Sequence, residues 1–209
     1  SSNAGWDGLG STSGAAEALT RFCRGYNIPV TTTMMGIGGF PESDPLSLKW
    51  LGMHGSVVAN NAANECDVLL AFGARFDDRV TGPVSTFATH AKIVHVDIDR
   101  SEINKNKPAH IGVVSDVKYV LEKLNENPIH QDYAEWHAQI AEWKEKFPLS
   151  YKDSELILPQ EAIALVDKVS NGQARIVPSV GQHQMWAAQY FTYSKPRQLM
   201  TSGGLGAMG

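Results

Sequence analysis

The sequence predicts an α/β protein: a doubly wound, mostly parallel sheet followed by an incomplete second α/β unit. Strand-like runs rich in β-branched and apolar residues alternate with segments of helical periodicity along the chain. Residues 68–73 are apolar throughout, and residues 92–97 hold the apolar core Ile93, Val94 and Val96, as in strands that are covered on both faces. Loops rich in glycine or charge follow these strands, at the position where such sheets bind ligands.

The elements of the first part follow from local spacing and composition. Ala18, Leu19 and Phe22 recur at helical spacing after a cap near Ser13, which predicts a helix over residues 15–26. Enrichment in β-branched residues indicates strands, and glycine, proline or an acidic first turn marks the boundaries between elements. The other expected elements are a strand at 28–33, a loop at 34–45, a helix at 55–65, strands at 68–73, 92–97 and 111–114 (the last short and at an edge), and a helix at 116–125.

The character of the sequence changes after residue 127. Trp136, Ile140 and Trp143 follow one another at spacings of four and three, and Phe147 continues the stripe. This pattern predicts an amphipathic helix over 133–147 whose aromatic side chains pack on a core or an interface. The elements expected after it are a linker at 148–159, a helix at 159–170, a strand at 175–180, a helix at 182–191, a strand at 198–202 and a final glycine-rich turn.

These elements predict four segments. Residues 1–11 include a Ser-Asn-Ala run typical of an expression remnant. Residues 12–127 form a central nucleotide-binding α/β domain, residues 128–158 a helix with a linker, and residues 159–209 the start of another domain. Two strands and two helices cannot close a second sheet domain of usual size, so we expect a piece of a longer protein.

Composition argues against several classes of protein. The 209 residues are 43% hydrophobic and 19% charged with a formal net charge of −4, which gives no electrostatic footprint for nucleic acid. We expect neither a membrane span nor a secretory signal, because no apolar run approaches the roughly 18 residues of a span. Cys23 and Cys66 stand outside any metal-ligand spacing, which predicts buried thiols in a reducing compartment.

The run from Arg75 to Gly82 is the most informative stretch. It places four charged side chains in a loop at the carboxyl end of a buried strand. The two guanidinium groups suit phosphates or carboxylates, which they grip bidentately, so the loop indicates an anion site. A solvated loop with internal Asp–Arg pairs is the alternative, and the residues alone leave both open.

Two glycine-rich loops could let a backbone approach a ligand closely. The loop at 32–39 lacks the opening of a dinucleotide fingerprint or a Walker loop, so a flexible loop is the competing interpretation. The loop at 51–55 brings in His54, which could donate to a ligand or cap the next helix. No spacing of metal ligands surrounds His54.

Two polar clusters also stand where strands end. Asp97 could accept hydrogen bonds from ribose hydroxyls, whereas Asp99 and Glu102 have the spacing of a helix-capping box. Residues 180–186 place polar side chains at the start of a helix, where either a phosphate or an internal network would fit. No Ser-His-Asp arrangement, metal-ligand cluster or pair of catalytic carboxylates stands out. The residues by themselves therefore reach an α/β protein with a nucleotide-like anion site.

Taken together, these motifs resemble the catalytic subunits of the acetolactate synthase (acetohydroxyacid synthase) family of thiamine-diphosphate enzymes. The resemblance runs from about residue 28 to the last residue, and the run at 75–82 separates this family from most other thiamine-diphosphate enzymes. Two other readings stay open: a stand-alone FAD or nucleotide-binding module, and another thiamine-diphosphate carboligase or oxidase. The segments that carry the resemblance are 29–36, 51–55, 71–82, 95–99, 181–186 and 202–206.

The resemblance implies that the chain holds the central FAD-binding domain of a three-domain subunit and the start of its diphosphate-binding domain. Arg79 matches the arginine that binds the carboxylate of the second 2-oxo acid. Ser115 stands where the family often has glycine. The implied FAD contacts are Thr33, Met34, Gly52, Met53, His54, Gly73, Arg75, Asp77, Arg79, Val80, Asp97, Ile98, Glu102, Asp116 and Val117. The residues that match positions near thiamine diphosphate are Gln182, His183, Gly206 and Met208.

The resemblance also implies an activity. The family condenses pyruvate with pyruvate or 2-oxobutyrate, with loss of CO2, in branched-chain amino-acid biosynthesis, and FAD takes no net redox part. The activating glutamate and the motif that holds Mg²⁺ and the diphosphate are expected outside this chain, so we expect the fragment alone to be inactive. The implied parent is a homo-oligomer, with or without a regulatory subunit, in the bacterial cytoplasm or in a eukaryotic organelle.

Overall fold

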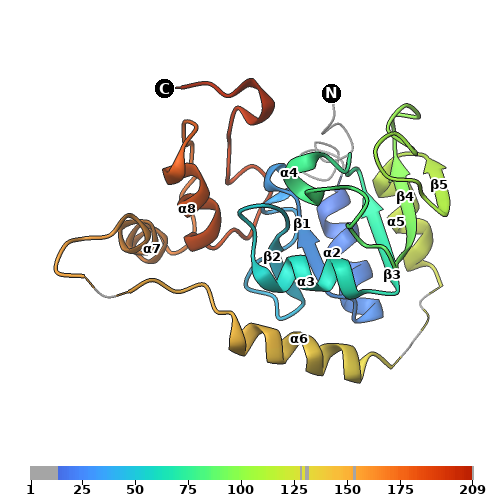
Figure 1. Cartoon of the computed structure of the whole chain (residues 1–209), viewed down its shortest axis with the longest axis horizontal. Coiled ribbons are helices and arrows are strands. Elements are labelled where there is room, and N and C mark those ends of the chain that lie inside the picture. Colours follow the sequence, from blue (N-terminus) through green and yellow to red (C-terminus); the bar gives the residue numbers. More distant parts are fainter. Residues whose placement is uncertain (1–13, 128, 130–131, 153, 209) are drawn as a thin grey trace.

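The computed structural model describes residues 14–127, 129, 132–152 and 154–208 and confirms an α/β architecture with parallel strands (Figure 1). We call residues 14–127 the central unit and residues 159–208 the C-terminal unit. The central unit contains α2 Ala15–Tyr26, β1 Val30–Thr32, η1 Met34–Gly36, β2 Ser47–Trp50, α3 Val57–Glu65, β3 Val68–Phe72, α4 Asp78–Thr81, β4 Lys92–Asp97, β5 Ile111–Val114 and α5 Val117–Asn125. After them come α6 Ala134–Lys146, α7 Pro159–Val169, α8 Gln182–Tyr190 and η2 Gly203–Leu205.

Parallel strands form the middle layer of the central unit. In the described residues, β1 pairs with β2, and β3, β4 and β5 form a second sheet with β4 in the middle. The predicted strands at 68–73, 92–97 and 111–114 are confirmed, including the edge position of the last. Strand β2 was missed, because it is only four residues long and contains Lys49, whose φ of 63° breaks the regular extended backbone.

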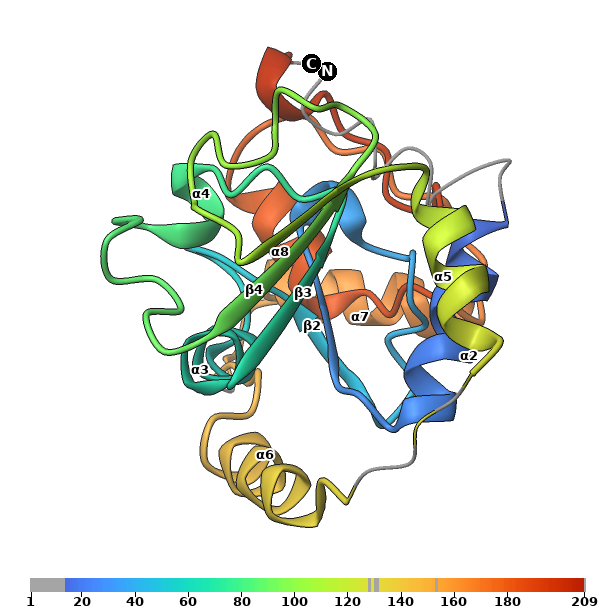
Figure 2. The same cartoon turned by 90° about the vertical axis from the view of Figure 1, so that its right-hand side faces the viewer.

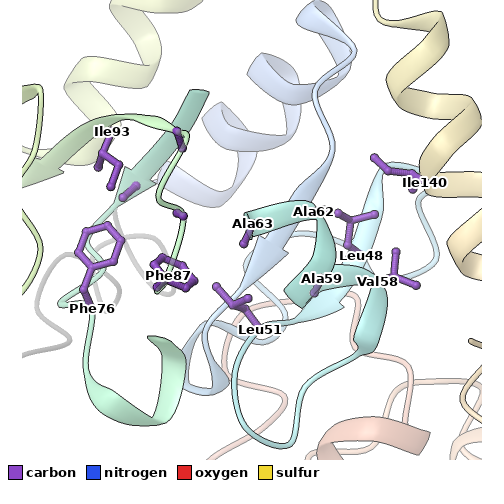
Figure 3. Packing of buried hydrophobic residues seen from close by; sticks show 13 residues of the cluster. Leu48, Leu51, Val58, Ala59, Ala62, Ala63, Phe76, Phe87, Ile93 and Ile140 are labelled. Atoms are coloured by element: carbon purple, nitrogen blue, oxygen red, sulfur yellow. The ribbon is translucent and has the colours of Figure 1, made fainter. Parts of the chain in front are cut away.

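Helices cover both faces of this layer, as a doubly wound sheet requires (Figure 2). On one face, Leu121 of α5 is buried in a single cluster with Val30 of β1 and Val96 of β4, together with the apolar side of α2. On the other face, a cluster joins α3 and α6 to Leu48 of β2 and Ile93 of β4 (Figure 3). Because each cluster draws on both sheets, the two sheets act as one layer.

Helix α6 packs through its predicted aromatic stripe. Ile140 is buried, and the rings of Trp136 and Trp143 meet edge to face, 5.6 Å apart, against the cluster on the α3 face. Phe147 departs from the prediction, because it is the C-cap of α6 and remains partly exposed. The stripe therefore fastens α6 to the central unit through its first three members.

Helix caps and thiols refine two further predictions. Helix α2 follows Gly14 with no side-chain cap, and Ser13 lies outside the described residues. Asp116 caps α5 by accepting a hydrogen bond from the Tyr119 amide, rather than lying in its first turn.

Cys23 is buried as predicted, whereas Cys66 is only partly buried. Burial raises the pKa of Cys23 to about 12 and that of Cys66 to about 11, so both thiols are neutral at pH 7.

The C-terminal unit is smaller and less regular. Its two predicted helices are observed as α7 and α8. The strands predicted at 175–180 and 198–202 are wrong as regular strands: in the described part of the chain they meet at an isolated parallel bridge between Ile176 and Leu199. Among the described residues each segment has only the other as a strand partner, and a two-stranded pair alone is marginally stable.

The two units touch through a small apolar cluster and a close backbone approach. Ile37 and Trp50 of the central unit are buried together with Phe191 and Tyr193 of the C-terminal unit. At Gly38, which has a φ of 87°, an added Cβ would collide with the Lys195 carbonyl group. Only glycine permits this approach without strain.

Candidate functional site

A cleft of about 540 Å³ lies at the carboxyl ends of β1, β2 and β3, where it faces the start of α8 and the turn at 203–204. This is the edge at which parallel sheets bind ligands. Of the predicted site residues, the cleft brings together Thr33, Met34, Met53, His54, Gly73, Arg75, Asp77, Arg79 and Val80. The other residues of its lining were not among the predicted contacts, although most of them belong to the motifs described above: Met35, Trp50, Leu51, Ala74, Phe76, Asp78, Val180, Gln184, Met185, Gly203 and Gly204.

The charged loop after β3 contains one internal ion pair. Arg75 Nε lies 2.6 Å from Asp77 Oδ2, and Asp77 Oδ1 accepts hydrogen bonds from the Arg79 and Val80 amides at 3.0 and 3.1 Å. Asp77 thus caps the short helix α4 and neutralises Arg75. Within the described residues Arg79 has no ion-pair partner, so its guanidinium remains available to an anion.

Phe76 explains how this loop is held. Its side chain is buried between the rings of Phe87 and His95, with centroids 6.2 and 5.2 Å away (Figure 3 shows Phe76 beside Phe87). Its backbone has a φ of 52°, a rare conformation for a bulky residue that costs about 1–3 kcal/mol. The buried ring offsets this strain, and the turn leaves Arg75 and Asp77 on the cleft wall.

The turn after β2 is fastened to the charged loop. The Met53 amide donates to the Arg79 carbonyl at 2.9 Å, and the Asn60 side chain bonds both the amide and the carbonyl of Gly52. Gly52 has a φ of 123°, and a Cβ there would sit 2.5 Å from the Arg79 carbonyl oxygen. A glycine is therefore needed for the two walls of the cleft to meet.

A buried polar group lies beneath the charged loop. His95 is fully buried, and in the described structure neither ring nitrogen has a hydrogen-bond partner within range. Burial lowers the pKa of His95, so the ring is neutral near pH 7. Asp97 Oδ2 lies 3.9 Å from His95 Nε2, and Asp97 Oδ1 accepts from the Asp99 amide at 2.8 Å. The Asp97 side chain thus points inward and is only 2% exposed.

Glu102 does not complete a capping box. Its carboxylate bonds Lys105 Nζ at 2.8 Å, and the Glu102 amide donates to the Asp99 carbonyl in a turn. The spacing was that of a box, but residues 101–104 form turns rather than a helix.

The remaining predicted contacts on this edge lie outside the cleft. Ile98 follows β4 and is 54% exposed, whereas Val117 is buried in the core at the start of α5. Asp116, after β5, uses one carboxylate oxygen to cap α5. These positions continue the sheet edge beyond the cleft, and only a ligand extended along that edge would reach them.

The residues of the C-terminal unit that are predicted to lie near thiamine diphosphate do not line this cleft. Gln182 and His183 are exposed in the first turn of α8 and do not line the cleft, and His183 Nε2 lies 3.0 Å from Ser179 Oγ. Gln184 and Met185 face the cleft instead. Gly206 and Met208 are exposed at the end of the described chain, beyond the cleft. Across the described ranges no group of three or more acidic, histidine or cysteine residues could hold a metal ion.

The chain is similar in sequence to known families and relatives. Residues 7–124, more than half of the chain, match the family described as thiamine pyrophosphate enzyme, central domain. The chain belongs to the thiamine pyrophosphate enzyme family. Residues 179–209 match the C-terminal TPP binding domain of the same enzymes. The cleft is therefore formed where the central domain of a thiamine pyrophosphate enzyme meets the first elements of its cofactor domain.

Curated relatives of this thiamine pyrophosphate enzyme chain are similar over nearly all of it. The chain is 52% identical over 207 residues to "Acetolactate synthase 1, chloroplastic" of Oryza sativa subsp. japonica, covering 96% of this chain and 32% of the relative. "Acetolactate synthase 1, chloroplastic" of Nicotiana tabacum is 52% identical over 207 residues, with coverage of 96% and 31%. "Acetolactate synthase, chloroplastic" of Arabidopsis thaliana is 52% identical over 202 residues, with coverage of 93% and 30%. The chain thus spans about a third of the length of these relatives.

In the part of the chain that the structure describes, every helix is too short or too polar to cross a bilayer.

Proposed function

We propose that this chain is part of an acetolactate synthase, an enzyme that joins two 2-oxo acids with loss of CO2. The observation that carries the proposal is the 52% identity to acetolactate synthases over 96% of the chain, which includes both walls of the cleft. Thiamine diphosphate, when bound in the complete enzyme, supplies the carbanion chemistry of such a reaction. The parent's substrates are then pyruvate and a second 2-oxo acid.

Within that enzyme, we propose that the central unit binds FAD along the carboxyl edge of its sheet. The cleft volume of about 540 Å³ lies in the range of small-molecule sites, roughly 300–1,000 Å³. The guanidinium group of Arg75 suits a phosphate of the FAD diphosphate. Trp50 Nε1 adds a buried donor in the wall that lacks a protein acceptor among the described residues. The residues present fit FAD, provided that it continues past the cleft toward Ile98 and Asp116.

We propose a division of labour between the two arginines. Arg75 is already oriented by Asp77, which makes it a preset contact for a phosphate group. Arg79, which has no ion-pair partner in the described residues, is placed to hold the carboxylate of the acceptor 2-oxo acid. Gln182, His183, Gly206 and Met208 stay proposed neighbours of thiamine diphosphate, and Mg²⁺ is proposed for the parent only.

The isolated chain is proposed to be catalytically inactive. The chain spans about a third of the length of its relatives. In the described residues the strand pairing of its C-terminal unit consists of one isolated bridge. The parent is proposed to be a homo-oligomer, with or without a regulatory subunit. Its location is the cytoplasm for a bacterial parent and an organelle for a eukaryotic one, and the plant relatives carry the word chloroplastic in their names.

The experiment that tests the cofactor proposal is a titration of the 209-residue chain with FAD, followed by quenching of flavin fluorescence. Saturable binding is expected, and Arg75→Ala should weaken it at least about tenfold because a charge-assisted hydrogen bond contributes roughly 1.5–3 kcal/mol. Arg21→Ala, at an exposed site on α2, is the matched control and should leave the affinity unchanged. A folded chain that never quenches flavin fluorescence would refute FAD binding by this unit.

The proposed inactivity is tested separately. No acetolactate should form when the purified chain is incubated with pyruvate, thiamine diphosphate, Mg²⁺ and FAD. Sustained acetolactate formation would overturn that part of the proposal without affecting the flavin titration.

A further inference from the structure

Glu42 is a buried carboxylate at the contact between the two units, away from the cleft. Its side chain is only 2% exposed. The Glu42 amide donates to the Tyr193 carbonyl at 2.8 Å, and Glu42 Oε2 accepts from the Tyr193 amide at 3.2 Å. Glu42 Oε1 has no hydrogen-bond partner among the described residues. One carboxylate thus holds a segment of the C-terminal unit on the central unit while half of its own bonding capacity is unused.

Charged groups from two other elements face this carboxylate. Lys49 Nζ of β2 lies 3.9 Å from Glu42 Oε2. Asp167 of α7 raises the pKa of Glu42 and accepts the Thr192 amide at 3.1 Å. Burial is the largest cause and raises the pKa of Glu42 to about 7, whereas the Lys49 charge and the Tyr193 amide lower that pKa. Burial and the Glu42 charge together raise the pKa of the Tyr193 hydroxyl. Glu42 therefore changes its charge within the physiological range of pH.

A chain of hydrogen bonds leads from this cluster to the cleft. Lys49 Nζ donates to the Gln189 carbonyl at 2.9 Å, and Gln189 Nε2 donates to the His54 carbonyl at 2.8 Å. His54 lines the cleft, and Lys49 has a φ of 63°, a backbone conformation that is rare for residues other than glycine. A change at Glu42 that redirects Lys49 acts on α8 and on the His54 wall together.

We propose that Glu42 is a proton-sensitive positioning residue, which in its neutral form holds α8 and the His54 wall in the arrangement described and in its ionised form draws Lys49 away from Gln189. Burial favours the neutral carboxyl group, whereas the Lys49 charge and the Tyr193 amide favour the ionised one. The ionised carboxylate competes with the Gln189 carbonyl for the Lys49 ammonium group, because the pair is 3.9 Å apart and can close. The proposal does not depend on which ligand fills the cleft.

The sign of the linked stability follows from the pKa of Glu42. The folded chain holds the proton up to a pH of about 7, whereas an unfolded glutamate releases it near about 4.3. The contribution of Glu42 to the free energy of unfolding is therefore largest at low pH. It falls as the pH rises from about 4.3 to about 7 and is constant above that range.

The test is an NMR titration of the full 209-residue chain from pH 5 to 9 without any cofactor, following glutamate carboxyl carbons, the Tyr193 amide and the Gln189 side-chain amide. The carboxyl signal that is lost in Glu42→Gln should titrate with a midpoint near 7, and both amides should shift with the same midpoint. In Glu42→Gln the amide shifts should disappear. Glu145→Gln, at an exposed position on α6, is the control and should change neither.

Two further variants keep the proposal testable should Glu42→Gln fail to fold. Lys49→Met should raise the Glu42 midpoint and Asp167→Asn should lower it, because the first removes an attractive charge and the second a repulsive one. A Glu42 midpoint below 5, or amide shifts that do not follow Glu42, would overturn the proposal. A merely structural glutamate would move neither amide with pH.

Discussion

The central unit and the C-terminal unit are built from similar elements, yet only the first closes around its own core. In the central unit, Leu121 and Ile140 close apolar clusters on the two faces of the sheet layer. In the C-terminal unit, α7 leaves Leu165 58% exposed, and the strand segments meet only at the Ile176–Leu199 bridge in the described residues. The difference teaches that local sequence can determine whether a segment forms a helix or a strand. A hydrophobic core forms only where other elements cover both faces of the sheet.

The largest test of this comparison is a matched pair of leucine truncations. Leu121→Ala should lower the free energy of unfolding by about 2–5 kcal/mol, because it opens a cavity in a fully buried cluster. Leu165→Ala should change it by less than about 0.5 kcal/mol, since that side chain is mostly exposed. Urea denaturation followed by circular dichroism measures both, and equal losses would break the comparison.

A smaller effect is expected from backbone strain in the central unit. Gly52→Ala should cost about 1–3 kcal/mol, because the new Cβ meets the Arg79 carbonyl in a strained backbone conformation. Gly25→Ala is the matched control: it lies within α2 with open space around its Cβ, so it should stabilise the chain by about 0.5–1 kcal/mol. Thermal unfolding of both variants should show opposite shifts, and a loss in Gly25→Ala would contradict the reasoning.

The smallest effects concern the caps of two helices, one from each unit. Ser56 caps α3 because its hydroxyl oxygen accepts a hydrogen bond from the Ala59 amide, whereas α7 begins after Leu158 with no side-chain cap. Ser56→Ala should cost about 1 kcal/mol, and Leu158→Asp should gain up to about 1 kcal/mol. Urea titration resolves both, and the same sign for the two variants would show that capping is not what distinguishes the helices.

Local sequence patterns predicted the elements whose side chains carry a strong period. The helix at 15–26 and the strands at 92–97 and 111–114 are observed with those bounds, since apolar spacing alone specifies them. Strand β2 was missed because Lys49 interrupts four residues of alternation. The strands of the C-terminal unit were overpredicted, because local β propensity cannot supply a partner strand.

The site residues also fall into those that local sequence predicted and those that depend on tertiary packing. Thr33, His54 and Arg75 meet in the cleft because parallel strands end at one edge, a fact that sequence order already implies. The motif at 180–186 was recognised, but which of its residues face the cleft depends on how α8 packs on the central unit, so Gln184 and Met185 were not predicted as contacts. The inward turn of Asp97 depends on the packing of His95 beside it, and no motif reports that.

The approach of Gly38 to the Lys195 carbonyl limits how this chain can be recombined. A chimera that joins one parent's central unit to another's C-terminal unit through the linker at 148–158 must keep glycine at 38 and the same backbone path at 195. Any side chain at residue 38 would wedge the halves apart before a single cleft residue had changed. The two units thus follow one another in sequence but have to be exchanged together, because their backbones are in close contact at Gly38 and Lys195.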